Sequence, residues 1–126
     1  MWLMLNDSFL SIVDAAKGEG CLLVRARREG DIERAFKDFA EIITVDRTPG
    51  RDYLFRAEIP RAVVARMVAE RVLALNYPNF KGSVNAKDRD LHDAYFHVWS
   101  TMEMLQPMAA FSAAPRRTHS RQRSGL

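Results

Sequence analysis

Residues 75–106 read LNYPNFKGSVNAKDRDLHDAYFHVWSTMEMLQ, and the rest of the chain is organised around them. The stretch opens with an aromatic segment that contains a proline at position 78 and continues as a long amphipathic pattern. Apolar residues recur there at helical spacing, which predicts a helix over about residues 87–106 with one buried stripe. The stripe consists of Leu91, Tyr95, Val98, Met102 and Leu105.

The preceding residues predict strands and two shorter helices. Short apolar runs predict strands at residues 2–5 and 9–14, and β-branched residues predict one at 41–46. Alternating positions predict strands at residues 21–28 and 53–59. In the last of these, Tyr53 is expected on the same face as Phe55, with Arg56 on the other face. Helical spacing predicts a short helix after Gly30 with Asp31 as its N-cap, and a second helix over residues 61–75. The order β-β-β-α-β-β-α-α indicates an α+β fold, in which helices pack on one face of an antiparallel sheet of about five strands.

The chain of 126 residues is predicted to form a single domain over residues 1–106, followed by a disordered tail over residues 107–126. The tail holds four arginines and no acid, so it accounts for the net charge of +3 and the domain itself is close to neutral. The basic isoelectric point is therefore no argument for nucleic-acid binding by the domain. One cysteine and the lack of a long apolar run favour a cytoplasmic protein with no disulfide and no membrane partner.

Residue types that carry catalysis or bind metals occur without a defining arrangement. Asp88 with His92, and Asp93 with His97, are i, i+4 pairs, but no third ligand has a defined spacing. The candidate nucleophiles lack a motif that would place a base beside them; they are Ser8, Ser11, Ser83 and Cys21. We therefore predict no catalytic residue, no metal and no cofactor. An enzyme of unidentified class is the third-ranked alternative.

Aromatic residues near the proline give the leading functional hypothesis. They exceed what one narrow buried stripe needs, and exposed aromatic residues are frequent anchors of protein interfaces. We expect a non-enzymatic protein-binding module whose partner is a second copy of the chain, giving a homodimer, or a different protein. For each residue alone, packing against the core is the alternative. The expected contact residues are Tyr77, Phe80, Phe96 and Trp99.

A basic sheet surface gives the second hypothesis, a small nucleic-acid-binding domain. Arg25 and Arg27 share one face of a predicted strand, and Arg56 lies on another strand. Basic sheet faces that also carry aromatic residues hold single-stranded RNA in some small domains. Glu58 shares the face of Arg56 and dilutes its charge. A solvated, salt-bridged surface explains the same residues, so nucleic acid ranks behind a protein as the expected partner.

Several segments together resemble a family of small proteins of bacterial genomes and mobile elements to which no activity is assigned. The segments are MWLMLNDSFLSIV, LLVRARREGDIERAF, and NYPNFKGSV with LHDAYFHVW. The resemblance covers about residues 1–106 and excludes the tail, and it transfers no catalytic residue. It implies an accessory protein of a phage or mobile element, such as an anti-CRISPR-like inhibitor of a bacterial defence complex.

Overall fold

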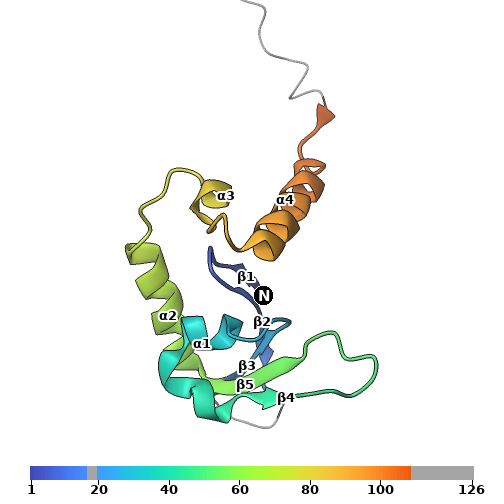
Figure 1. Ribbon diagram of the computed structural model, residues 1–126. Helices are drawn as coiled ribbons and strands as arrows, with labels where there is room; N and C mark the ends of the chain where they lie inside the picture. Colours follow the sequence, from blue (N-terminus) through green and yellow to red (C-terminus); the bar gives the residue numbers. More distant parts are fainter. Residues whose placement is uncertain (17–19, 109–126) are drawn as a thin grey trace, which may run out of the picture.

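Five antiparallel strands form one sheet in the computed structural model, which describes residues 1–16 and 20–108 (Figure 1). The α+β fold predicted from the sequence is confirmed. The predicted disordered tail lies outside the described residues from position 109 onward. The strands lie in the order β1 (Trp2–Met4), β2 (Phe9–Asp14), β3 (Cys21–Ala26), β5 (Phe55–Pro60) and β4 (Thr44–Val45).

One face of the sheet is covered by α1 (Asp31–Ala35), the 3-10 helix η1 (Lys37–Ile42) and α2 (Arg61–Leu73). Gly30, with a φ of 91°, turns the chain from β3 into α1. Helix residues at 3.6-residue spacing meet strand residues at alternate positions, as amphipathic elements must when they bury their apolar faces. The main core comprises Ile32, Phe36, Val64 and Met67 from the helical side and Leu10, Ile12, Val24, Ala26, Ala57 and Ile59 from the strands.

The last two helices, α3 (Phe80–Ser83) and α4 (Arg89–Glu103), build a second, smaller core. Leu91 and Tyr95 of α4 pack there with Met4 and Phe9 of the first hairpin. Met4 and Phe9 alternate with residues of the main core, so they point to the opposite side of the hairpin. The prediction that the helices share one face therefore holds for α1 and α2 and is wrong for α4.

The segment between α1 and β5 also differs from the prediction. Helical spacing had extended the first helix to Phe39, and β-branched residues had predicted a strand over residues 41–46. Phe36 instead leaves the α-helical conformation (φ −133°), η1 runs on through Glu41 and Ile42, and the predicted strand is shortened to β4 (Thr44–Val45). This path sets Phe39 and Ile43 against the main core. The gain in apolar burial outweighs the local β preference, which is a weak determinant when tertiary packing competes with it.

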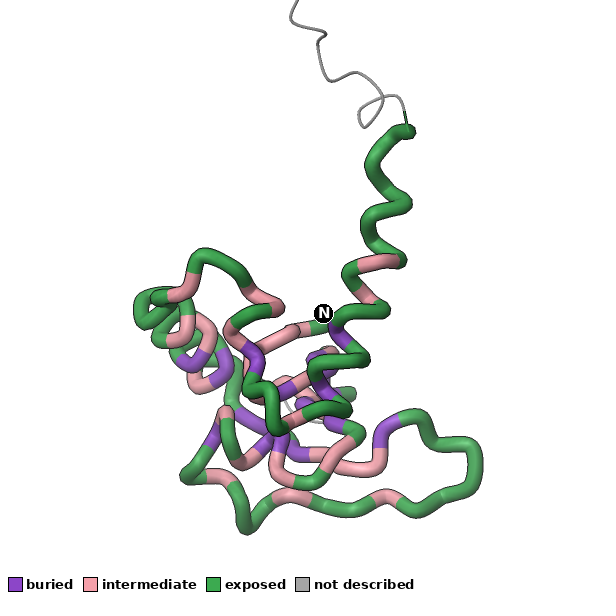
Figure 2. Tube along the Cα trace, turned by 45° about the horizontal axis from the view of Figure 1, so that its top comes forward, coloured by how far each residue is buried: buried purple, intermediate pink, exposed green. Residues whose placement is uncertain are grey.

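Helix α4 extends beyond the domain (Figures 1 and 2). Leu91 and Tyr95 are buried and Val98 is half-buried, but Met102 is 56% and Leu105 75% exposed. The prediction that the whole stripe is core is thus wrong for its last two members. Met4 and Phe9 of the hairpin pack against Leu91 and Tyr95, whereas Met102 and Leu105 are exposed and do not belong to this cluster.

A buried carboxylate connects the first hairpin to α1 and α4. Asp31, only 1% exposed, accepts a hydrogen bond from the Phe9 amide at 3.1 Å and pairs with both Arg28 and Arg34. Arg28 also bonds Asp88 at 2.8 Å, and Asp88 caps α4 by accepting from the Leu91 amide. Burial would lower the pKa of Arg28, but its bonds to Asp88 and Asp31 raise it. The predicted N-cap is therefore a central ion-pair partner.

Two further contacts fix the turn between β1 and β2. The Tyr95 hydroxyl lies 2.8 Å from the carbonyl oxygen of Leu5 and 2.9 Å from that of Ser8. From the other side, Arg71 of α2 makes two hydrogen bonds to the Asp7 carboxylate, at 3.1 and 3.2 Å. The turn is thus held by side chains from helices distant in the sequence.

Candidate functional site

The aromatic residues singled out from the sequence come together beside α3 and α4. The rings of Tyr77 and Phe80 have centroids 6.1 Å apart, and Phe80 lies 5.3 Å from Tyr95 in the second core. Phe96 and Trp99 lie 6.0 Å apart on α4 and are 48% and 45% exposed. Tyr77 and Phe80 are half-buried. The first pair therefore anchors the loop to α4, and the second pair remains accessible.

Lys81 of α3 joins these two pairs. Its ammonium nitrogen lies 3.5 Å from the centroid of the Trp99 ring and 5.8 Å from that of Phe96. A cation over an aromatic face is attracted by the negative potential of the ring and holds it in position. Lys81 was not among the predicted contact residues, although its position directly after Phe80 was a visible signal in the sequence. We call the combined surface the α4 face; it comprises Tyr77, Phe80, Lys81, Phe96, Trp99, Met102 and Leu105.

The predicted basic residues lie on the sheet surface opposite the main core. Arg25 and Arg56 are direct cross-strand neighbours, and Arg25 donates to the Ser11 hydroxyl at 2.8 Å. The guanidinium carbons of Arg25 and Arg27 lie 4.5 and 4.7 Å from the centroid of the Tyr53 ring. Tyr53 is buried, but beneath these arginines and not on the main-core side. The prediction for Tyr53 is wrong because β5 begins at Phe55, so strand alternation does not reach it.

Acidic and carbonyl groups neutralise or occupy much of this basic surface. Asp46 lies 3.1 Å from Arg51 and 3.8 Å from Arg56, and Arg27 donates to the carbonyl of Asp52 at 3.2 Å. Such a mixture of charges gives little of the continuous positive potential that attracts a phosphate backbone. Nucleic-acid binding through Arg25, Arg27 and Arg56 stays a prediction.

The three serines among the candidate nucleophiles make structural contacts, and Cys21 is a half-buried free thiol at the start of β3. The hydroxyls of Ser8 and Ser11 accept hydrogen bonds from Arg34 and Arg25, and Ser83 donates to the Phe80 carbonyl at 2.6 Å. Within residues 1–16 and 20–108, no cluster of three or more histidine, cysteine or acidic residues is placed to hold a metal ion. None of the helices in the described part of the chain has the length and apolar character needed to cross a bilayer.

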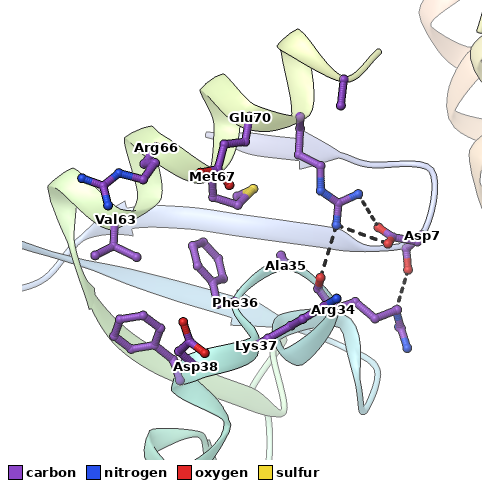
Figure 3. Close-up of a pocket in the computed structure, with 13 residues that line it drawn as sticks. Asp7, Arg34, Ala35, Phe36, Lys37, Asp38, Val63, Arg66, Met67 and Glu70 are labelled. Atoms are coloured by element: carbon purple, nitrogen blue, oxygen red, sulfur yellow. Dashed lines mark hydrogen bonds and ion pairs between the residues drawn. The ribbon is translucent and has the colours of Figure 1, made fainter. Parts of the chain in front are cut away.

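One hollow is an open groove of about 1030 Å³ between α2 and the α1–η1 segment (Figure 3). Its floor consists of core residues such as Phe36 and Met67, and charges of both signs line its rim. At one end Arg71 of α2 donates to the Arg34 carbonyl of α1 at 3.3 Å, which joins the two walls, and also bonds Asp7 of the first turn. The groove thus combines a short apolar floor with a mixed rim, which favours no one ligand charge.

A smaller hollow of about 230 Å³, which we call the hairpin pocket, lies between α4 and the β1–β2 hairpin. Trp2 and Phe9 line its sheet side, where their rings meet edge to face with centroids 5.3 Å apart. Ala94 and Val98 line its helix side. These residues could not be linked from the sequence, because a contact between the first strand and the last helix leaves no local pattern in the chain.

Comparisons of the chain with protein-family models, with curated proteins and with solved structures gave no match. The resemblance to mobile-element proteins, and the accessory or anti-defence role that it implies, stay predictions.

Proposed function

We propose that this protein is a non-enzymatic protein-binding module whose contact surface is the α4 face. The observation that carries the proposal is the apolar stripe of α4, which continues past the second core into solvent. Leu91 and Tyr95 use it to dock the helix, whereas Met102 and Leu105 extend it with no core beneath them. A helix that presents such a stripe is a common recognition element for an apolar groove or for another helix.

The magnitude of the available burial indicates how much surface a stable complex needs. Fully burying a leucine, methionine or aromatic side chain contributes about 1.5–3 kcal/mol. Trp99, Met102 and Leu105 are about half to three-quarters exposed, so covering them would contribute roughly 3–6 kcal/mol. Association itself costs at least about 4 kcal/mol in lost translational and rotational freedom. A stable partner must therefore also cover Phe96 and the neighbouring loop.

Site-specific photo-crosslinking tests this proposal. A benzophenone amino acid replaces Met102 in the full chain, and light is applied in the cells that express it. The matched control carries the same group at Arg66, an exposed position of α2. We expect a discrete adduct from position 102 and none from position 66. Light scattering of the purified chain then shows whether the partner is a second copy or a different protein.

Substitution of Trp99 by alanine provides the second part of the test. Because Trp99 is about half exposed, the variant should keep its folded far-ultraviolet spectrum and lose most of the adduct formed at position 102. A monomeric protein with equal crosslinking from positions 102 and 66 would contradict the proposal. Unfolding of the Trp99 variant would instead show that this residue belongs to the core.

A further inference from the structure

The hairpin pocket has the size and the lining of a site for one aromatic ring. Its volume of about 230 Å³ exceeds that of a cavity of roughly 150 Å³ that binds benzene. The rings of Trp2 and Phe9 form one wall, and Ala94 and Val98 form the other. Ala94 leaves the helix side open, because its side chain is a single methyl group.

The charged residues around this pocket differ in how many hydrogen-bond and ion-pair partners they have. Arg28 and Asp31 are satisfied by each other and by Asp88, Arg34 and the Phe9 amide. Arg27 donates to the Asp52 carbonyl through Nε, and within the described part of the chain its terminal nitrogens have no hydrogen-bond partner and no carboxylate. Its guanidinium carbon lies 5.9 Å from the centroid of the Phe9 ring. A fixed cation with free donors thus lies beside an apolar pocket.

We propose that the hairpin pocket binds a small aromatic carboxylic acid. The ring enters between Trp2 and Ala94, and the carboxylate accepts hydrogen bonds from the terminal nitrogens of Arg27. Two nitrogens of a guanidinium match the two oxygens of a carboxylate, so this pairing fixes the direction in which the ring enters. The site uses other residues than the exposed end of the α4 face, and it requires no protein partner.

Asp90 indicates a second charged group on the expected ligand. It also lines the pocket, and no residue that the structure describes forms a hydrogen bond or ion pair with its carboxylate. An ammonium group next to the ligand carboxylate would supply the missing counter-charge. An aromatic amino acid should therefore bind more tightly than the corresponding simple acid, and both should bind more tightly than a neutral alcohol of the same size.

Nuclear magnetic resonance titration of the full chain tests the proposal with three probes: L-phenylalanine, 3-phenylpropionate and 3-phenylpropanol. We expect saturable shifts of the amide signals of Phe9, Ala94 and Val98, with affinity decreasing in that order of probes. Arg27→Met should weaken binding of the two acids about ten-fold or more, because a charge-assisted hydrogen bond is lost. Arg66→Met on α2 is the matched control and should change nothing.

Filling the pocket gives an independent readout. Ala94→Leu should abolish the shifts for every probe, whereas Ala69→Leu, at an exposed position of α2, should preserve them. If Ala94→Leu loses its folded spectrum, Ala94→Met takes its place. The proposal is overturned if no probe gives saturable shifts up to about 10 mM, a weak-binding limit for ligands of this size. Equal binding of the alcohol, or binding unaffected by Arg27→Met, would overturn it as well.

Discussion

Asp31 is the residue on which most of the charge in the interior depends. It pairs with Arg28 and Arg34 and accepts from the Phe9 amide while almost fully buried. Whether such a pair is favourable overall depends on desolvation, but removing one partner leaves uncompensated charge in a partly dry site. The sequence showed an acidic residue at a helix start, a position for which an N-cap role is the usual explanation.

Replacing Asp31 by asparagine should lower the free energy of unfolding by about 1.5–3 kcal/mol, since Arg28 and Arg34 lose charge-assisted hydrogen bonds but stay partly exposed to solvent. Asparagine has nearly the same shape, so the loss would come from charge and not from a cavity. Asp38→Asn, on the exposed side of η1, is the control and should change stability by less than about 0.5 kcal/mol. Urea unfolding at pH 7 measures both; equal stabilities would contradict this account.

Because of Tyr95, the stability of the folded state should decrease as the pH rises into the alkaline range. Burial, followed by the negative charge of Asp31, raises the pKa of Tyr95 above its ordinary value of 10.0. The folded state thus retains a proton that the unfolded chain releases first. The stability that this difference provides is complete below about pH 10 and is lost as the pH rises from there toward the raised pKa.

Tyr95→Phe should cost about 1–2 kcal/mol at pH 7, where the hydroxyl bonds the turn carbonyls. Above pH 10 the difference in the free energy of unfolding between wild type and variant should become smaller. Only the unfolded wild-type chain can release the Tyr95 proton, and this release stabilises its unfolded state. Urea unfolding at pH 7, 9 and 10.5 measures this difference. Tyr77→Phe serves as the control, since the Tyr77 hydroxyl forms no hydrogen bond with any described residue. A difference that stays constant with pH would refute the assignment.

At the scale of single elements, α4 consists of a docked half and an exposed half. Leu91→Ala should lower the free energy of unfolding by about 2–5 kcal/mol, as for other buried leucines. Met102→Ala should change it by less than about 0.5 kcal/mol, because that side chain has no core beneath it. Thermal unfolding of the two variants compares the halves directly. A large loss from Met102→Ala would show that the helix is packed along its whole length.

The individual helices and strands also show which features a local sequence pattern can predict. Alternation found β2, β3 and β5, and helical spacing found α2 and α4, because each of these elements buries one face against the molecule. Tyr53 was placed on the wrong face and the strand predicted over residues 41–46 was too long, since β4 covers only Thr44–Val45. Both errors arise because the positions depend on Arg25, Arg27 and the main core, which come from other parts of the chain. Met102 and Leu105 show the same limit, because periodicity identifies an apolar stripe and not what covers it.

At the scale of the whole molecule, two cores share the first hairpin. Leu10 and Ile12 belong to the main core, while Met4 and Phe9 belong to the second. The aromatic candidate residues could be selected from the sequence because composition and spacing are local properties. The hairpin pocket could not be, because it joins Trp2 to Val98 and exists only once both cores have formed.

The contact between Tyr95 and the first turn imposes an order on biosynthesis. The carbonyl oxygens of Leu5 and Ser8 accept from the hydroxyl of Tyr95, which lies 90 and 87 positions later in the chain. On the ribosome, the hairpin therefore emerges long before Tyr95. Met4, Phe9 and Phe80 stay uncovered until α4 docks. A chain interrupted before α4 would display these residues to chaperones and proteases. The docking of α4 thus covers the apolar surface by which an incompletely folded chain would be recognised.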